Sequence, residues 1–366
     1  MKHQIKLIKP YINFDEISSQ AKEIFDTGIF TRGQHVEAFT NELRSYTRAK
    51  HAFLTTSATT ALTVSLKAIG VKSGDEVAVS DFSWPATCNV VEDLGAIPLF
   101  VDVDKDTYNM SSKDLSKRIN SGVKAVIFVD ALGNPSGIDR IKEITTSYGI
   151  PLIQDSACGI GSASSECKVG AISDFTCYSF HPRKLVTTGE GGAILTNNDV
   201  YAEWLGIKLA CGMTRDVSGD IEFVDFGYNY RLSELQALMG RIQLKKLDEI
   251  TESRNDVARE YTNGLEPMGF RSQRVSPEAY HNKQSVVLTV PTGINRDTLI
   301  DYLRARGIES TLGTYCLSNT TYYRKKYKDV QKNALWLQQN TITLPCYEGV
   351  DVGTVIGCIM DFVSDV

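Results

Sequence analysis

A carboxylate at Asp155 and an amine at Lys184 are the two groups in this chain whose types and order could act together on one reacting molecule. Asp155 ends the apolar run 151–155, and Lys184 lies in the glycine-flanked segment 178–192. A lysine can hold an aldehyde as a Schiff base, and a carboxylate facing a pyridine nitrogen keeps that nitrogen protonated, so that the ring withdraws electrons. Taken alone, each residue also fits an ordinary role, as a surface lysine or a helix-capping aspartate. With the segments described below, the pair predicts pyridoxal phosphate as cofactor and Lys184 and Asp155 as catalytic residues.

Such a cofactor also needs an anion site and an aromatic face. Ser57, Ala58 and Thr59 follow a β-like run at the start of a helical stretch, where free backbone N–H groups and the helix dipole favour a phosphate. Ser179 could add a hydroxyl, and Trp84, which follows another β-like run, could stack on the pyridine ring. A plain helix cap at Ser57 and a core tryptophan at Trp84 remain alternatives on the sequence alone.

Short apolar runs alternate with helical stretches through the first half of the chain. This alternation predicts an α/β fold with a wound, mostly parallel sheet, in which active groups collect at the carboxyl ends of the strands. Asp155 is at such an end. The runs expected to form strands are 51–55, 76–80, 97–101, 125–129 and 151–155.

A long helical pattern at 233–264 is expected to link this large part to a smaller one. After it, the strand-like run 285–290 and the helical stretch 296–306 predict an α+β arrangement. We therefore expect a large cofactor-binding domain over residues 1–245, which includes the N-terminal segment, and a smaller C-terminal domain over 246–366.

Composition excludes several other classes of protein. The net charge of −5 supplies no basic field for nucleic acid, and no run approaches the length needed to span a membrane. The eight cysteines include no C-x-x-C pair, so no metal site is expected, and the protein is expected to be cytoplasmic. The segment 159–164 lacks the third glycine of a dinucleotide fingerprint, which argues against a nicotinamide enzyme.

These segments together resemble the sugar-nucleotide aminotransferases of the DegT/StrS type, which are fold-type I pyridoxal phosphate enzymes. The resemblance covers nearly the whole chain. The matching segments are 27–33, 57–62, 74–77, 155–157, 179–184 with 188–192, and 227–237. It implies a fold-type I transferase with a large sheet domain and a smaller C-terminal α+β domain.

The resemblance also implies roles for individual residues. Lys184 matches the Schiff-base lysine, Asp155 the partner of the pyridine nitrogen, and Trp84 the stacking aromatic residue. Asn229 matches an asparagine that reaches the cofactor phosphate of the neighbouring subunit, which implies a homodimer with shared active sites. The residues that match the phosphate site are Ser57, Ala58, Thr59 and Ser179.

Three segments depart from the family pattern. Cys158 stands where the family usually has glutamine or histidine near the phenolic oxygen of the cofactor, and a thiol is a weaker hydrogen-bonding group. Ala58 replaces the usual glycine of the phosphate turn, which is tolerable if its φ is not positive. The segment 313–318 differs from the Pro-x-His of many relatives, so substrate contacts cannot be transferred there.

The activity implied by the resemblance is transfer of an amino group from L-glutamate to a nucleotide-linked keto sugar. The sequence TTGEGG after Lys184 favours C4 of a 4-keto-6-deoxyhexose. Arg183 and Arg231 are candidates for binding the substrate anions, although each also fits a surface arginine. The alternatives are amination of a 3-keto sugar nucleotide and a non-catalytic relative that binds a nucleotide sugar.

Overall fold

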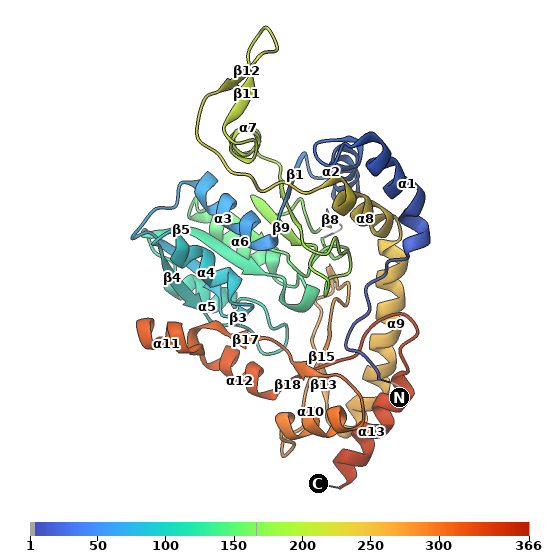
Figure 1. The fold of residues 1–366 in the computed structure, drawn as a ribbon. Helices are drawn as coiled ribbons and strands as arrows, with labels where there is room; N and C mark the ends of the chain where they lie inside the picture. The colour runs from blue at the N-terminus through green and yellow to red at the C-terminus, as the bar shows by residue number, and fades with distance from the viewer. Residues whose placement is uncertain (1–3, 166, 366) are drawn as a thin grey trace.

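The computed structural model describes residues 4–165 and 167–365, and its centre is a seven-stranded sheet (Figure 1). The strand order is β1-β10-β9-β6-β5-β2-β4, and every neighbouring pair is parallel except the two pairs that involve β10. The expected wound, mostly parallel α/β sheet is confirmed. Its strands are β1 (His51–Thr55), β2 (Glu76–Ser80), β4 (Ile97–Val101), β5 (Val123–Val129), β6 (Leu152–Asp155), β9 (Phe175–Ser179) and β10 (Gly192–Thr196).

Helices cover both faces of this sheet because its strands are apolar on both sides. Val77 and Val79 of β2 face one hydrophobic cluster, while Ala78 between them faces another. On the first face lie α3 (Ala58–Ile69), α4 (Ala86–Asp93) and α7 (Asp199–Leu209). On the opposite face lie α2 (Gln34–Thr47), α5 (Ser112–Arg118), α6 (Ile138–Ser147) and α8 (Glu234–Lys245), with α1 (Phe14–Thr27) outside α8.

The helix expected over 233–264 is two helices in the structure. Ser233 caps α8 through a reciprocal pair of hydrogen bonds with Gln236, as its sequence position suggests. At Lys246 the backbone leaves the helical region, with φ −106° and ψ 5°, and α9 (Leu247–Leu265) begins there in a new direction. The periodic apolar pattern continues across the break because both helices bury one face, so the pattern did not reveal the bend.

The C-terminal part forms a second, antiparallel sheet of order β13-β15-β18-β16, with helices against it. The N-terminal segment joins this part, since Ile5 pairs with Ile308 and the carbonyl of Leu7 accepts the N–H of Cys346. Both termini therefore lie at the same end of the molecule (Figure 1). The strands and helices of this part are β13 (Arg271–Ser272), β15 (Val286–Thr289), β16 (Thr311–Leu312), β18 (Thr341–Leu344), α10 (Arg296–Ala305), α11 (Thr321–Tyr327), α12 (Lys332–Asn340) and α13 (Val352–Ser364).

The two-domain division at 245/246 stays a prediction, but it falls one residue before the bend at Lys246. Two smaller sheets add to the main ones. One has two strands, β3 (Phe82–Ser83) and β17 (Tyr315–Cys316). The other has three, with β7 (Ala163–Ser164) between β8 (Cys167–Lys168) and β14 (Ala279–Tyr280). None of the helices in the described part of the chain is both long and apolar enough to cross a bilayer.

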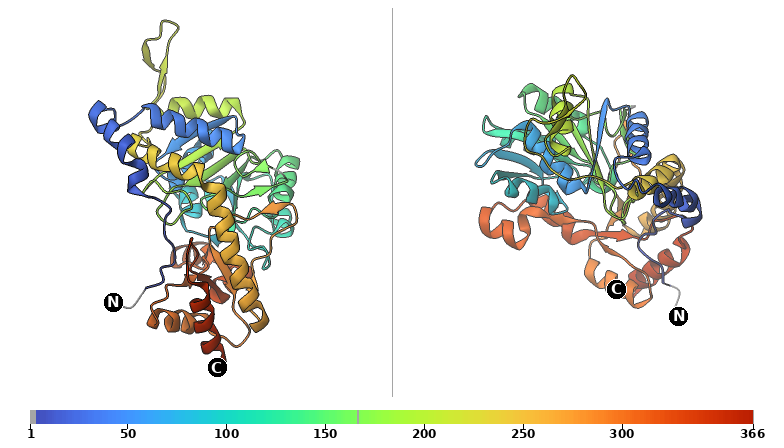
Figure 2. Two further views of the ribbon diagram at one scale, coloured as in Figure 1. Left: turned by 90° about the vertical axis from the view of Figure 1, so that its right-hand side faces the viewer. Right: turned by 45° about the horizontal axis from the view of Figure 1, so that its top comes forward.

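A hairpin formed by β11 (Met213–Arg215) and β12 (Ile221–Phe223) projects away from the rest of the molecule (Figure 2). It carries unusually exposed apolar side chains. Phe223 and Phe226 each expose 70% of their surface, and Val224 exposes 49%. A large exposed apolar patch on a projecting arm is typical of an interaction surface.

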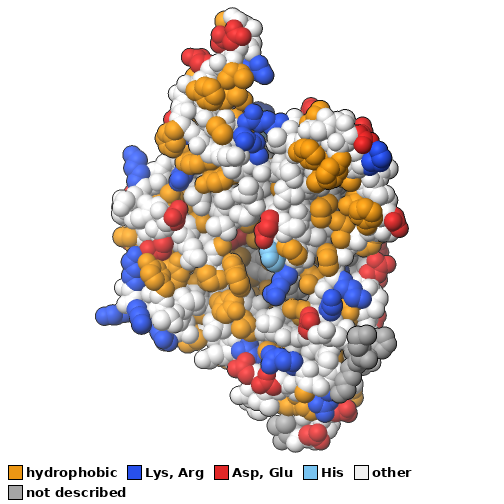
Figure 3. Space-filling view, viewed as in Figure 1, with side chains coloured by type: hydrophobic (Ala, Val, Ile, Leu, Met, Phe, Trp, Pro, Cys, Tyr) orange, Lys and Arg blue, Asp and Glu red, His pale blue; other side chains and the backbone are white. Residues whose placement is uncertain are grey.

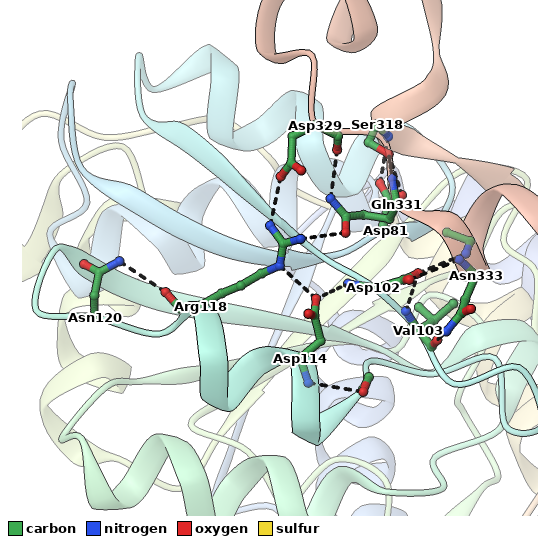
Figure 4. A network of polar contacts seen from close by, with 12 residues as sticks. Asp81, Asp102, Val103, Asp114, Arg118, Asn120, Ser318, Asp329, Gln331 and Asn333 are labelled. Atoms are coloured by element: carbon green, nitrogen blue, oxygen red, sulfur yellow. Dashed lines mark hydrogen bonds and ion pairs between the residues drawn. The ribbon is translucent and has the colours of Figure 1, made fainter.

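A polar network joins the C-terminal part to the ends of β2 and β4 (Figure 4). The buried carboxylate of Asp81, just after β2, accepts hydrogen bonds from the N–H and hydroxyl of Ser318, at 2.7 and 2.6 Å, and from the thiol of Cys316 at 3.1 Å. Asp102, after β4, accepts the N–H groups of Asn333 and Ala334 at the start of α12, where the helix dipole favours an anion. These two carboxylates hold residues 316–334 against the large sheet.

We predict that Asp81→Ala lowers the free energy of unfolding by about 3 kcal/mol, because the donors of Ser318 and Cys316 would stay buried without an acceptor. Urea denaturation measures the change. Asp106→Ala is the matched control, since this exposed carboxylate has only a 3.7 Å ion pair with Arg274, and it should change the free energy by less than about 0.5 kcal/mol. Equal effects of the two variants would contradict the network's importance.

Candidate active site

A cavity of about 570 Å³ lies where the strands of the large sheet end. Ser57 follows β1, Asp155 ends β6 and Ser179 ends β9, so all three reach the cavity from carboxyl ends, as parallel strand ends in an α/β sheet do. Gln284 and Thr314 of the C-terminal part complete its wall. The space-filling view shows a hollow near the middle of this face, with acidic, basic and histidine side chains around it (Figure 3).

Asp155 is a buried carboxylate that borders this cavity. Its Oδ2 accepts a 2.7 Å hydrogen bond from the hydroxyl of Thr87 on α4, and its Oδ1 accepts the N–H of Ala157 at 3.2 Å. Burial raises the pKa of Asp155, while these two hydrogen bonds and the charge of Lys184 oppose that rise. Thr87 in turn contacts the hydroxyl of Ser83 at 2.8 Å. The carboxylate is therefore held in one orientation by groups from two elements.

A second buried carboxylate, Asp130, lies beside Asp155 at the end of β5 and also lines the cavity. Burial raises its pKa to about 7, and the nearby charge of Asp155 acts in the same direction. Gln154 donates to it at 2.9 Å, and the Ser156 hydroxyl donates to it as well. Asp130 was not among the residues predicted from the sequence, although it directly follows the strand-like run 125–129, just as Asp155 ends the run 151–155.

Lys184 sits on a tight turn that begins at the end of β9. The N–H of Lys184 donates to the carbonyl of His181 at 2.9 Å. The side chain of Gln284 brackets the turn, since it accepts the N–H of Leu185 at 3.0 Å and donates to the carbonyl of Arg183 at 2.6 Å. This contact across the chain fixes where the lysine amine can reach.

The Nζ atom of Lys184 donates to the thiol sulfur of Cys158 at 3.1 Å. Cys158 lines the cavity three residues after Asp155, so the residue that departs from the family pattern does lie beside the lysine amine.

Ser57, Ala58 and Thr59 form the start of α3, and all three line the cavity. The Ser57 hydroxyl accepts the N–H of Thr60 at 3.1 Å, which leaves the first backbone N–H groups of the helix available to an anion. Ala58 lies inside the helix, so its φ is not positive. Gly192 of β10 makes room for this turn, because a Cβ there would approach the carbonyl carbon of Ser57 to 2.5 Å.

Trp84 lies on the cavity wall with 64% of its surface exposed. Its ring meets that of Tyr315 edge to face, with the centroids 5.7 Å apart. Tyr315 belongs to the segment 313–318, whose contacts the sequence could not assign. The pairing of β3 with β17 and the hydrogen bonds to Asp81 bring that segment to Trp84.

The two arginines expected to bind substrate anions lie at different places in the structure. Arg183 lines the cavity, whereas Arg231 lies at a different depression of about 220 Å³ with Thr31 and Leu209. Asn229 is exposed beyond the β11–β12 hairpin and does not line the cavity of its own chain. The arginine that the structure adds to the cavity wall is Arg254, which is buried and donates to the carbonyls of Lys283, Gln284 and Cys346.

The groups around the cavity fit a phosphorylated pyridine aldehyde. An unpaired helix start suits its phosphate, a buried and oriented carboxylate suits its ring nitrogen, and the lysine amine beside Cys158 suits its aldehyde. Within residues 4–165 and 167–365, no group of three or more histidine, cysteine, aspartate or glutamate side chains could hold a metal ion.

Comparison with known proteins agrees with this arrangement. The profile of the DegT/DnrJ/EryC1/StrS aminotransferase family matches residues 12–360. An uncharacterized protein of Methanocaldococcus jannaschii is 31% identical over 98% of this chain and 97% of its own length. A GDP-perosamine synthase of Vibrio cholerae is 28% identical over 93% of this chain and 94% of its own.

A solved structure in PLP form shares the whole fold. It belongs to a proposed sugar aminotransferase of Streptococcus pneumoniae, with 25% identity, a TM-score of 0.91 and coverage of 99% of both chains. The fold-type I architecture expected from the sequence is thereby confirmed. The chain therefore belongs to the DegT/DnrJ/EryC1/StrS aminotransferase family, and pyridoxal phosphate is its cofactor.

Proposed function

We propose that this aminotransferase moves an amino group from L-glutamate to a nucleotide-linked keto sugar, at C4 of a 4-keto-6-deoxyhexose. The observation that carries the proposal is the convergence of Lys184 and Asp155 on one cavity that is also lined by polar groups of both parts of the molecule. Relatives support the sugar nucleotide, since one is a GDP-perosamine synthase and a structure of similar fold is of DesI in the presence of its TDP-sugar product. The TTGEGG sequence after Lys184 supports C4.

In this proposal, different cavity residues bind different parts of the cofactor. The start of α3 at Ser57, Ala58 and Thr59, with the hydroxyl of Ser179, binds the phosphate. Trp84 and Cys158 line the cavity, where Trp84 would stack on the ring and Cys158 would contact its phenolic oxygen. When bound, pyridoxal phosphate supplies an aldehyde that carries the amino group and a ring that accepts electrons.

Asp155 would hold the proton on the ring nitrogen of the bound cofactor, and the hydrogen bond from Thr87 favours the charged form of that carboxylate. Burial disfavours the charge on Asp155, so its pKa would rise further without the hydrogen bond from the threonine. A protonated Asp155 could not stabilise a positive charge on the nitrogen. Thr87 is thus a positioning residue that acts through Asp155.

Lys184 would hold the cofactor through its aldehyde, and its Nζ atom would move the proton of the donor α-carbon. Gln284 holds both sides of the Lys184 turn, so the amine returns to the same place in each half-reaction. Arg183 at the cavity is the candidate for a substrate anion. Arg231 lies outside the cavity of its own chain, and its role as a substrate ligand stays a prediction.

A homodimer with shared sites completes the proposal. Asn229 is exposed and lies next to the apolar hairpin, whose phenylalanines need a covering surface. A second copy of the chain could cover the hairpin and receive Asn229 at its own phosphate site, and a two-fold axis would make the two sites equivalent.

The substrate proposal predicts amination of 4-keto-6-deoxyhexose nucleotides, because the TTGEGG sequence after Lys184 favours C4. A panel of 3-keto and 4-keto sugar nucleotides is incubated with L-glutamate, and mass spectrometry and NMR identify the aminated carbon. Lys184→Ala is the control and should give no product, and borohydride reduction of the wild type should attach the cofactor to Lys184. Product aminated only at C3, or activity confined to free keto acids, would overturn the proposal.

Thr87→Val is expected to weaken cofactor binding about tenfold, because a hydrogen bond to a charged group contributes about 1.5–3 kcal/mol. The variant keeps the shape of the side chain and removes the donor to Asp155. Titration of the apoprotein with pyridoxal phosphate, followed by absorbance, measures the dissociation constant. Thr292→Val, at an exposed threonine of the C-terminal part, should leave it unchanged. Identical dissociation constants for both variants would show that Thr87 does not support Asp155.

Shared sites predict that two defective subunits complement each other. A hybrid of Lys184→Ala and Asn229→Ala subunits has one site with both changes and one site with neither, so it should recover roughly half of the wild-type activity. Differently tagged subunits allow the hybrid to be purified and its turnover to be compared with that of each parent homodimer. A purified hybrid no more active than the Asn229→Ala parent would mean that each chain completes its own site.

A further inference from the structure

His181 is a cavity residue to which the mechanism above assigns no role. It lies on the Lys184 turn, three residues before the lysine, and its side chain is half-buried on the cavity wall. The turn fixes its backbone on both sides, since its N–H donates to the Ser179 hydroxyl at 3.3 Å and its carbonyl accepts the N–H of Lys184. Any group that His181 binds is therefore positioned relative to the lysine amine.

The hydrogen bonds of the imidazole determine which nitrogen carries the proton. Its Nδ1 atom accepts the backbone N–H of Arg183 at 3.2 Å. A neutral imidazole with an accepting Nδ1 must carry its hydrogen on Nε2. No residue in the described part of the chain forms a hydrogen bond with Nε2. The turn thus presents a free N–H donor to the cavity.

The surroundings of His181 favour this neutral form. Burial lowers the pKa of His181, the carboxylate of Glu190 opposes the shift, and the cations Lys184 and Arg183 add to it. His181 therefore remains a neutral donor at pH 7 and adds no charge beside Lys184.

Glu190 provides an acceptor on the other end of the same turn. It lines the cavity, and its carbonyl is held by the Thr188 hydroxyl and the Gln236 amide, both at 2.7 Å. Its carboxylate has no hydrogen-bond donor among the described residues. A donor and an acceptor thus flank Lys184, and this pair is complementary to a hydroxyl group, which both donates and accepts.

We propose that His181 is a substrate-binding residue whose Nε2 hydrogen donates to a hydroxyl oxygen of the acceptor sugar next to the reacting carbon. This inference rests on the proposed function, because it takes a sugar as the acceptor. The amino donor L-glutamate has no hydroxyl group on its carbon chain, so the contact belongs to the second half-reaction alone. His181 then contributes to the selection of a sugar rather than a simple keto acid as acceptor.

Two variants separate this role from a structural one. His181→Asn keeps an acceptor for the Arg183 N–H, because its Oδ1 lies near the position of Nδ1, but it lacks the distal donor. His181→Gln carries an amide N–H near the position of Nε2 and loses the acceptor. A role limited to the turn would be preserved by asparagine, and a role in binding sugar would be rescued by glutamine.

Each half-reaction is measured separately, by absorbance in single turnovers, with L-glutamate and then with the keto sugar nucleotide that the wild type aminates fastest in the panel. We expect His181→Asn to raise the KM for the sugar nucleotide about tenfold, the effect of one lost hydrogen bond. His181→Gln should return the KM to within about threefold of the wild type. Both variants should carry out the glutamate half-reaction at rates within about twofold of the wild type.

Equal losses in both half-reactions, or a wild-type KM in His181→Asn, would overturn the assignment. If the wild type aminates no sugar nucleotide in the panel, the proposed function itself is contradicted, and this result differs from the two variant results above.

The protonation state of His181 can also be measured in the apoprotein, without substrate. Nitrogen NMR of His181 at pH 7 should show a neutral ring protonated on Nε2, and a ring protonated on Nδ1 or on both nitrogens would also overturn the assignment.

Discussion

The buried carboxylate of Asp155 is the constraint on which the rest of the site depends. A carboxylate out of water tends to take up a proton, and burial raises the pKa of Asp155. Hydrogen bonds from Thr87 and Ala157 oppose that rise, together with the charge of Lys184. Because Thr87 belongs to α4 and Asp155 to β6, the charge depends on how that helix packs on the sheet.

Lys184 is also positioned by contacts between different elements. The Lys184 turn begins at the end of β9, next to β6 in the sheet, so the amine and the carboxylate approach the cavity from adjacent strands. Gln284 of the C-terminal part then fixes the turn through its side-chain amide, and buried Arg254 holds the carbonyl of Gln284. The position of the lysine amine thus depends on contacts between the two parts of the chain.

The contacts of Asp81 and Asp102 attach the C-terminal part to the large sheet at a second place. Asp81 holds Cys316 and Ser318, and the segment they belong to carries Tyr315 to Trp84. This part of the cavity wall is therefore positioned by the buried side chain of Asp81.

The sequence by itself determined five of the seven strands of the large sheet, the strand-end position of Asp155, the start of a helix after Ser57 and the lysine segment, but not strands β9 and β10. These features depend on local patterns, namely apolar runs, cap residues and the glycines around a turn, and such patterns act over a few neighbouring residues. Only the tertiary structure decided that Thr87 supports Asp155, that Gln284 brackets Lys184, and that the chain bends at Lys246. It also separated Arg231 and Asn229 from the cavity of their own chain. The physical reason is that each of these outcomes is a contact between residues far apart in sequence, and packing rather than local propensity chooses such partners.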